Sequence, residues 1–176
     1  MPSIFIAIGS NINPANNLKA AATLLRDVHP VIRFSSVYRS SPIHHEQQDD
    51  FLNAVAAFDA DHSPDQIYDL ISEVEKILKK NPPFRFGPRT IDLDLLLHGE
   101  FVLPDKDVWE STHPKSEIRN PQLIIPHPRM HERRFVLEPL TELLDPNLKH
   151  PIIGKSWKEL LEQTMDQQVR RIGIVL

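Results

Sequence analysis

The sequence predicts an α+β fold in which helices pack on the faces of one antiparallel sheet. Two segments of helical periodicity alternate with four strand-like segments in the order β-α-β-β-α-β, which is the order of a ferredoxin-like split unit. The chain has 176 residues, about the length of one domain, and 40% of them are apolar, enough for an ordinary core. We therefore expect residues 1–176 to form a single domain.

The first predicted strand covers residues 4–8, where apolar side chains point to both faces, and it ends at the turn-like Gly9-Ser10-Asn11. Residues 16–28 follow as a helix, because their apolar positions recur at helical spacing. The alternating segment from Val31 to Arg39 predicts a second strand, and residues 40–50 are expected to form a loop.

The third strand is predicted at Phe51–Asp59. Ser63 and Gln66 then make a capping box with proline at the first helical position, so a helix should run from Pro64 to about Lys79. The prolines that follow forbid its continuation. Residues 91–97 form the fourth predicted strand, and residues 100–103 are expected to pair back with it.

The last third of the chain is less regular. Residues 104–121 have no clear period and are predicted to be an exposed loop, a surface insertion in the domain. A helix interrupted by Pro139 is predicted at 132–144, and a capping box at Ser156 opens a further short helix. Residues 169–175 are expected to form an edge strand.

Composition excludes several classes of protein. The formal net charge of −4 offers no broad cationic surface, so we expect no nucleic-acid partner. The absence of cysteine removes disulfides, thiolate metal sites and cysteine nucleophiles. The N-terminus does not resemble a signal peptide and no apolar run is long enough to cross a membrane. A cytoplasmic protein without a membrane partner is expected.

Two carboxylates stand within the fourth predicted strand, in the stretch "FGPRTIDLDLLLHG". Strand side chains repeat every second residue, so Asp92 and Asp94 should project from one face with Cα atoms about 6.6 Å apart. Such a pair can hold one or two Mg²⁺ ions in a phosphoryl transfer site. The alternative is that one aspartate pairs with Arg89 while the other is exposed on a face of the sheet that is partly open to solvent.

Two groups of basic residues accompany the aspartates. Arg85 and Arg89 lie just upstream, where guanidinium groups can hold phosphate oxygens. His127 and Arg133 belong to a second basic segment near a helix start, which is another candidate for phosphate binding. Two carboxylates with two basic clusters favour a nucleoside triphosphate as ligand. The chain has neither a P-loop sequence nor a kinase glycine loop.

Five blocks follow one another along the chain: "AIGSN", "SSVYRSSP", "DFLNAV", "FGPRTIDLDLLL" and "IPHPRMHERRFVLEPL". Together they resemble the 6-hydroxymethyl-7,8-dihydropterin pyrophosphokinase family of folate biosynthesis. The resemblance implies a ferredoxin-like α+β fold, with ATP as co-substrate and two Mg²⁺ ions. It also implies transfer of pyrophosphate from ATP to the hydroxymethyl group of the reduced pterin, with release of AMP. Small molecules would be the partners, and we expect a monomer.

The resemblance also implies roles for residues of this chain. Asp92 and Asp94 would hold the two Mg²⁺ ions, and Arg85 and Arg89 would act on the phosphates. ATP would be bound by His127, Arg133, Lys80 and Glu75. The pterin would lie against Asn53, which reads its polar edge, and against these residues: Phe51, Phe135, Phe86, Ser40, Pro42 and Ile43.

The chain departs from the family pattern in the loop before the aspartates. Phe86 stands where the family usually has tryptophan, so stacking is kept but the indole donor is lost. Lys79 and Lys80 replace a glycine-arginine pair, and lysine lacks the bidentate fork of arginine. The main alternative is therefore a non-catalytic homologue that binds ATP or pterin with an altered loop. A nucleotide-sugar transferase and a metal-dependent nuclease are more distant alternatives.

Overall fold

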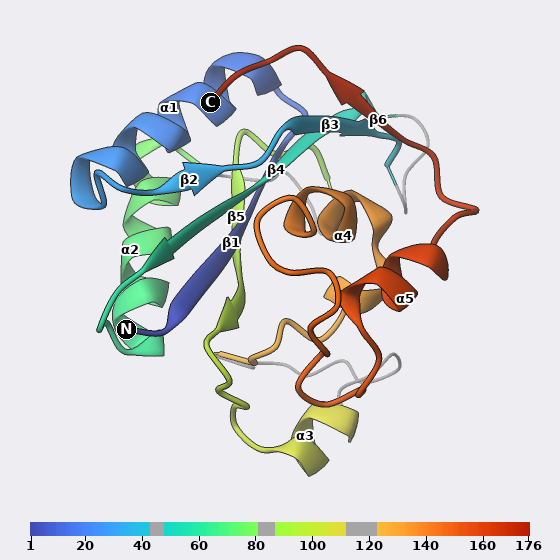
Figure 1. Ribbon diagram of the computed structural model, residues 1–176. Helices are drawn as coiled ribbons and strands as arrows, with labels where there is room; N and C mark the ends of the chain where they lie inside the picture. The colour runs from blue at the N-terminus through green and yellow to red at the C-terminus, as the bar shows by residue number, and fades with distance from the viewer. Residues whose placement is uncertain (43–47, 81–86, 112–122) are drawn as a thin grey trace.

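The computed structural model describes residues 1–42, 48–80, 87–111 and 123–176 (Figure 1). The strands are β1 (Ser3–Ser10), β2 (Arg33–Phe34), β3 (Val37–Ser40), β4 (Phe51–Asp59), β5 (Asp92–His98) and β6 (Val169–Ile172). The helices are α1 (Pro14–Val28), α2 (Pro64–Ile77), α3 (Lys106–Ser111), α4 (Arg134–Leu140) and α5 (Trp157–Glu162), with a 3₁₀ turn at Met130–Glu132. The sites predicted at Ile43, Arg85 and Phe86 lie outside the described residues.

One antiparallel sheet organises the fold. The strand order is β5-β1-β4-β3-β6, and β2 pairs with β4 beside β3. Its first strands follow the β-α-β-β-α-β order that the sequence predicts, with β1 and β4 at the centre. The predicted α+β, ferredoxin-like class is confirmed, and β6 adds an edge strand beyond β3.

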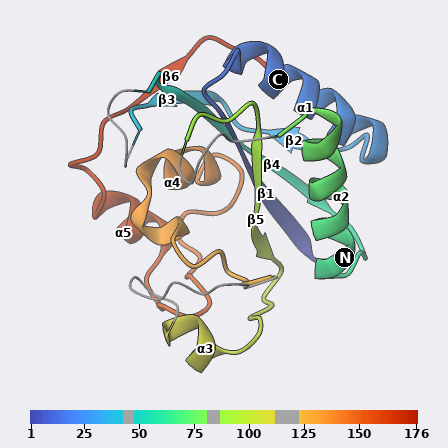
Figure 2. The same cartoon turned by 180° about the vertical axis from the view of Figure 1, so that it is seen from behind.

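The two faces of the sheet carry different helices. Helices α1 and α2 cover one face, where Ile4, Ile6 and Ile8 of β1 pack with Leu18 and Ile67 (Figure 2). Helices α4 and α5 lie on the opposite face, over the side chains of β1, β4 and β5 that alternate with those. Each fully buried isoleucine or leucine contributes about 1.5–3 kcal/mol. Both faces of the central strands are therefore core, which explains their continuous apolar sequence.

The strand that carries the aspartates is an edge strand with an irregularity. Asp94 lies opposite Ala7 and Asp92 opposite Gly9, but the register with β1 shifts between Phe5 and Ile6. The shift accommodates the extra residue Leu96. Up to the shift, side chains alternate as predicted, so both carboxylates share the face that α4 covers.

Two predicted elements are shorter than expected. The segment from Val31 to Arg39 splits into β2 and β3, because Ser35 binds Val55 in place of regular pairing: its Oγ accepts from the amide of Val55 at 2.9 Å. The helix predicted at 132–144 covers only Arg134–Leu140, and a 3₁₀ turn precedes it. The capping boxes at Ser63 and Ser156 are both present.

The segment after β5 differs from the sequence prediction in two places. Residues 100–103 do not pair back with β5 in the described structure; Leu103 instead forms a bridge with Ile125. The segment 104–121 was expected to be an exposed loop, but residues 106–111 form α3. The Trp109 side chain is buried and donates from Nε1 to the carbonyl of Pro126 at 2.6 Å. Residues 112–122 lie outside the described part.

Candidate active site

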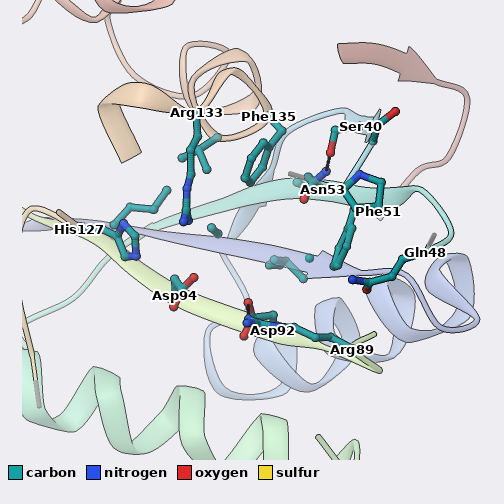
Figure 3. A pocket seen from close by; sticks show the side chains of 18 residues that line it. Ser40, Gln48, Phe51, Asn53, Arg89, Asp92, Asp94, His127, Arg133 and Phe135 are labelled. Atoms are coloured by element: carbon teal, nitrogen blue, oxygen red, sulfur yellow. Dashed lines mark hydrogen bonds and ion pairs between the residues drawn. The ribbon is translucent and has the colours of Figure 1, made fainter. Parts of the chain in front are cut away.

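A pocket opens on the α4 side of the sheet, across the ends of β1, β3, β4 and β5 (Figure 3). Carboxylates of β5 lie at one end, an asparagine with two phenylalanines at the other, and basic side chains lie over the first end. Predicted site residues that line the pocket are Ser40, Pro42, Phe51, Asn53, Arg89, Asp92, Asp94, His127, Arg133 and Phe135. The structure therefore brings together residues spread over 95 positions of the chain.

Asp92 is engaged by two cations. Its Oδ2 pairs with Nη1 of Arg89, and its Oδ1 lies 2.6 Å from Nζ of Lys80. The Asp92 carboxylate is only 20% exposed, so these pairs are screened less than surface pairs. Asp94 makes no ion pair with any residue of the described segments. One aspartate, Asp92, thus pairs with Arg89, as the alternative reading of the sequence expected. Both carboxylates nevertheless line the pocket.

Glu75 and Lys80 lie behind the pocket rather than in its lining. Oε1 of Glu75 accepts from Nζ of Lys80 at 2.6 Å and from the amide of Leu93 at 2.7 Å. Burial raises the pKa of Glu75 although Lys80 opposes the shift. Burial alone would lower the pKa of Lys80, but the charges and hydrogen bonds of Asp92 and Glu75 outweigh it and raise that pKa. Lys80 is therefore a firmly protonated cation between two carboxylates.

The end of α2 aims Lys80 at this position. Lys79 has φ of 57°, in the left-handed region, and its amide donates to the carbonyl of Lys76 at 3.1 Å. The amide of Lys80 donates to the carbonyl of Glu75 at 2.9 Å. Together these bonds form a Schellman turn, whose left-handed residue is usually glycine. In this chain a lysine takes the left-handed position, where a side chain with a Cβ is strained.

Basic side chains lie opposite the aspartates. The amide of His127 donates to the carbonyl of Leu96 at 2.9 Å, which anchors this segment to β5. Burial and the neighbouring Arg129 lower the pKa of Arg133, and its Nε has no hydrogen-bond partner among the described residues. Burial also lowers the pKa of His127, although Asp94 opposes the shift. A half-buried guanidinium whose Nε has no partner among the described residues favours an anionic ligand.

The other end of the pocket suits a flat polar ring. Nδ2 of Asn53 donates to Oγ of Ser40 at 2.9 Å, which fixes the amide plane. Phe51 and Phe135 lie on either side of this amide in Figure 3, and Gly9 lies opposite it on β1. A Cβ at Gly9 would be 3.4 Å from Oδ1 of Asn53, so a larger side chain would crowd the amide.

The sequence reasoning missed the residues that tie the pocket segments together. Oδ1 of Asn11 accepts from the amide of Arg89 at 2.7 Å, and its Nδ2 donates to the carbonyl of Asp49 and to Oε1 of Gln48. Ser10 donates from Oγ to the carbonyl of Thr90 at 2.6 Å. The only signal for these residues was their position in "GSN", directly after the first strand, where polar side chains commonly bond to loop backbone.

The described residues contain no group of three or more histidine, cysteine, aspartate or glutamate side chains that could hold a metal by itself. Two carboxylates on one strand face fit Mg²⁺ nevertheless, since this ion keeps several waters and uses one or two carboxylates together with substrate phosphates. The donor set therefore suits a metal that arrives with a nucleotide.

The family assignment follows from comparison with known proteins. A sequence model described as 7,8-dihydro-6-hydroxymethylpterin-pyrophosphokinase (HPPK) matches residues 5–145. The chain belongs to the HPPK family. A 2-amino-4-hydroxy-6-hydroxymethyldihydropteridine pyrophosphokinase of Bacillus subtilis is 34% identical over 142 residues, 79% of this chain and 76% of that protein. Its counterpart in Haemophilus influenzae is 35% identical over 147 residues, 81% of this chain and 82% of that protein. The predicted family resemblance is confirmed.

Solved structures agree on the fold. The Plasmodium falciparum HPPK-DHPS triple mutant with pteroate superposes with a TM-score of 0.67 at 14% identity, over 97% of this chain. The matched part is 46% of that chain, so this protein spans less than half of its length. At this identity the likeness concerns the fold alone.

No helix of the described residues is long and apolar enough to span a membrane.

Proposed function

We propose that this HPPK-family chain transfers pyrophosphate from ATP to the hydroxymethyl group of 6-hydroxymethyl-7,8-dihydropterin and releases AMP, as a step of folate biosynthesis. The observation that carries this proposal is the two-ended pocket. Its Asn53 end offers an amide and aromatic rings, which suit a planar heterocycle with donors and acceptors along one edge. Its Asp92 end offers carboxylates and cations, which suit a metal-bound polyphosphate.

Mg²⁺ dependence, with two ions, is part of the proposal. Asp92 and Asp94 would hold the ions, as the shared strand face and the oxygen donors permit. Bound Mg²⁺ would supply neutralisation of phosphate charge as the diphosphate moves. The residues of the chain contribute the rest of the binding and orientation.

The acceptor end would work by positioning. Asn53, locked by Ser40, would hold the pterin edge, and Phe51 and Phe135 would hold its ring plane. Pro42 lines the same end. A ring held there would direct its hydroxymethyl group toward the aspartates, because they form the opposite end of the pocket. Ile43 and Phe86, outside the described residues, stay predictions for the same ligand.

The donor end would work by electrostatics. Arg89 and Arg133 would bind phosphate oxygens, and the half-buried His127 would donate to the phosphates. In the reaction, the hydroxymethyl oxygen releases its proton to solvent and forms a bond to the β-phosphorus, and the bond from that phosphorus to the oxygen of the α-phosphate breaks. AMP leaves with that oxygen. Arg85, outside the described residues, is a further predicted phosphate contact.

Product analysis tests the proposal. The protein is mixed with MgATP and 6-hydroxymethyl-7,8-dihydropterin, and nucleotides and pterins are separated by chromatography. AMP formed in step with a pyrophosphorylated pterin supports the proposal. ADP would contradict the site of attack. Pterin binding without turnover would favour the non-catalytic homologue, which no feature of the described pocket supports. Omission of Mg²⁺ should abolish AMP formation.

Three further expectations concern the domain organisation, the oligomeric state and the location of the protein. We propose a single catalytic domain over residues 1–176, a monomeric state and a cytoplasmic location. The chain covers 76% and 82% of two bacterial relatives, and this comparable length supports the single domain. Sedimentation of the purified protein with and without MgATP measures the oligomeric state.

A further inference from the structure

The two predicted metal carboxylates differ in how much of them is available. Both oxygens of Asp92 are already in contact with cations, Oδ1 with Lys80 and Oδ2 with Arg89. Asp94 makes no ion pair with any described residue. A divalent ion that enters the pocket would therefore find one free carboxylate and one neutralised carboxylate. A metal ion on Asp92 would compete with at least one of these two cations.

Lys80 is a cation that the fold itself holds in place. The Schellman turn at the end of α2 sets its backbone, through the bond from its amide to the carbonyl of Glu75. Its Nζ lies 2.6 Å from Oε1 of Glu75 and 2.6 Å from Oδ1 of Asp92. Glu75 is fixed in turn by the amide of Leu93, which lies between the two aspartates. Lys80 is thus a tethered ammonium group rather than a freely moving surface lysine.

Electrostatics make Lys80 and a divalent metal competitors. With the side chains of Lys80 and Asp92 only 25% and 20% exposed, like charges at this site repel strongly. An ammonium group 2.6 Å from Oδ1 uses one of the two lone pairs of that oxygen and fills part of the space that a metal ion would take. Phosphate oxygens of a nucleotide would offer Lys80 a new partner at the moment when the metal takes Asp92.

We propose that Lys80 is an internal counter-cation of the metal site: it neutralises Asp92 until metal and nucleotide enter together, and thereby suppresses binding of the metal alone. This inference rests on the proposed use of Asp92 as a metal ligand. It gives Lys80 a positioning role on the carboxylate in addition to any contact with ATP. The consequence is a binding site that couples metal to nucleotide.

The test measures metal affinity without nucleotide and without turnover. Mn²⁺ replaces Mg²⁺ as the probe, and free Mn²⁺ is followed by electron paramagnetic resonance during titration of the whole chain. Lys80→Met should bind Mn²⁺ about tenfold more tightly than the unmodified protein, the usual size of coupling between competing charges. Lys80→Arg keeps the charge and should stay near the original affinity. Affinity in Lys80→Met that is equal or weaker overturns the proposal.

A matched control separates the local effect from net charge. Lys76→Met removes the same charge from the last turn of α2, shortly before Lys80, but Lys76 is exposed and pairs with Glu73 at 3.6 Å. Its Mn²⁺ affinity should not change. An equal gain in Lys76→Met and Lys80→Met would show a general charge effect and would reject the counter-cation role.

A second measurement covers the case in which Lys80→Met folds poorly. Lys80→Gln keeps a hydrogen-bond donor for Glu75 and Asp92 but removes the charge. A non-hydrolysable ATP analogue should raise Mn²⁺ affinity in the unmodified protein by a larger factor than in Lys80→Gln. Equal factors overturn the proposal.

Failure of this inference and failure of the proposed activity give different results. Unchanged Mn²⁺ affinity together with AMP formation rejects only the counter-cation. Tighter Mn²⁺ binding in Lys80→Met, with no AMP from the unmodified protein, rejects only the activity.

Discussion

Nδ2 of Asn53 donates a hydrogen bond to Oγ of Ser40 at 2.9 Å, between two neighbouring strands of the sheet. Both side chains are buried, so the bond fixes the orientation of the amide in the pocket. An asparagine held in this way presents its remaining donor and acceptor in one direction. This is the arrangement needed to read the edge of a heterocycle.

Asn53→Ala should therefore impair use of the pterin selectively. We expect kcat/KM for the pterin to fall by about 10²-fold, because polar ligand groups would lose their partner. The KM for ATP should stay within twofold, since Asn53 lies at the opposite end from the aspartates. Ser40→Ala is the graded control and should cost less, because it removes the orienting bond only. Equal losses for both substrates would contradict a pterin role.

Substitutions of the two aspartates should differ in their effect on the stability of the fold. Asp94→Asn is expected to abolish turnover, by at least about 10²-fold, without loss of stability, because Asp94 has no described ion pair. Asp92→Asn should also abolish turnover, but it leaves Lys80 and Arg89 without their carboxylate and should destabilise the fold by about 1–3 kcal/mol. Urea denaturation without metal measures the difference. Turnover above a tenth of the original rate in either variant would argue against metal binding there.

The contribution of Arg89 to turnover should depend on the hydrogen bond between its backbone amide and Asn11. Arg89→Ala is expected to lower kcat by roughly 10²-fold, the usual cost of removing one donor to developing phosphate charge. Asn11→Ala removes the acceptor of the Arg89 amide and the links to Gln48 and Asp49, so it should lower kcat less and leave the metal site intact. Single-turnover kinetics with saturating substrates report the chemical step. An Arg89→Ala effect confined to KM would contradict its role in that step.

Lys79 offers a test of the turn that places Lys80. Its φ of 57° is strained for a residue with a Cβ, so Lys79→Gly should stabilise the fold by about 1 kcal/mol or less. Lys79→Ala is the control, because it removes the charge but keeps the Cβ, and its stability should match the original. Thermal unfolding distinguishes the two. Equal stability of the glycine and alanine variants would mean that the strain is absent.

The buried His150 should make the stability of the fold depend on pH. Burial and the neighbouring His131 lower its pKa to about 3, and its Nδ1 lies 3.2 Å from the amides of Ile152 and Ile153, which donate to it. The unfolded chain therefore binds a proton near the ordinary pKa of 6.5 while the folded chain does not. The stabilising contribution is complete above pH 6.5 and is lost by about 1.4 kcal/mol per pH unit as pH falls toward 3.

The measurement compares urea midpoints at pH 7 and pH 5. His150→Asn can place an amide oxygen near the same two backbone amides but cannot be protonated, so its loss between these values should be smaller. The same loss in both proteins would assign the acid sensitivity to other groups. The ring centroids of Trp157 and His150 lie 5.2 Å apart, so the fluorescence of Trp157 can report the unfolding transition.

Local pattern was enough to predict much of the fold. Apolar runs of strand length predicted β1, β4 and β5, and the capping box predicted the start of α2, because these features depend on neighbours within a few positions. The period of two of strand side chains placed Asp92 and Asp94 on one face. Trp109 shows the limit: its segment has no clear period, and residues distant in sequence, among them Pro126 and His150, contact its side chain.

The sequence by itself determined the order of strands and helices, the shared face of the two aspartates and the family, since all three are written in short-range patterns and motifs. The tertiary structure alone decided that Asn11 would support Arg89, 78 residues away, and that Lys80 would neutralise Asp92. These contacts depend on where the sheet brings the end of each strand and helix. No local periodicity encodes that placement, because it arises from packing the whole chain around a common core.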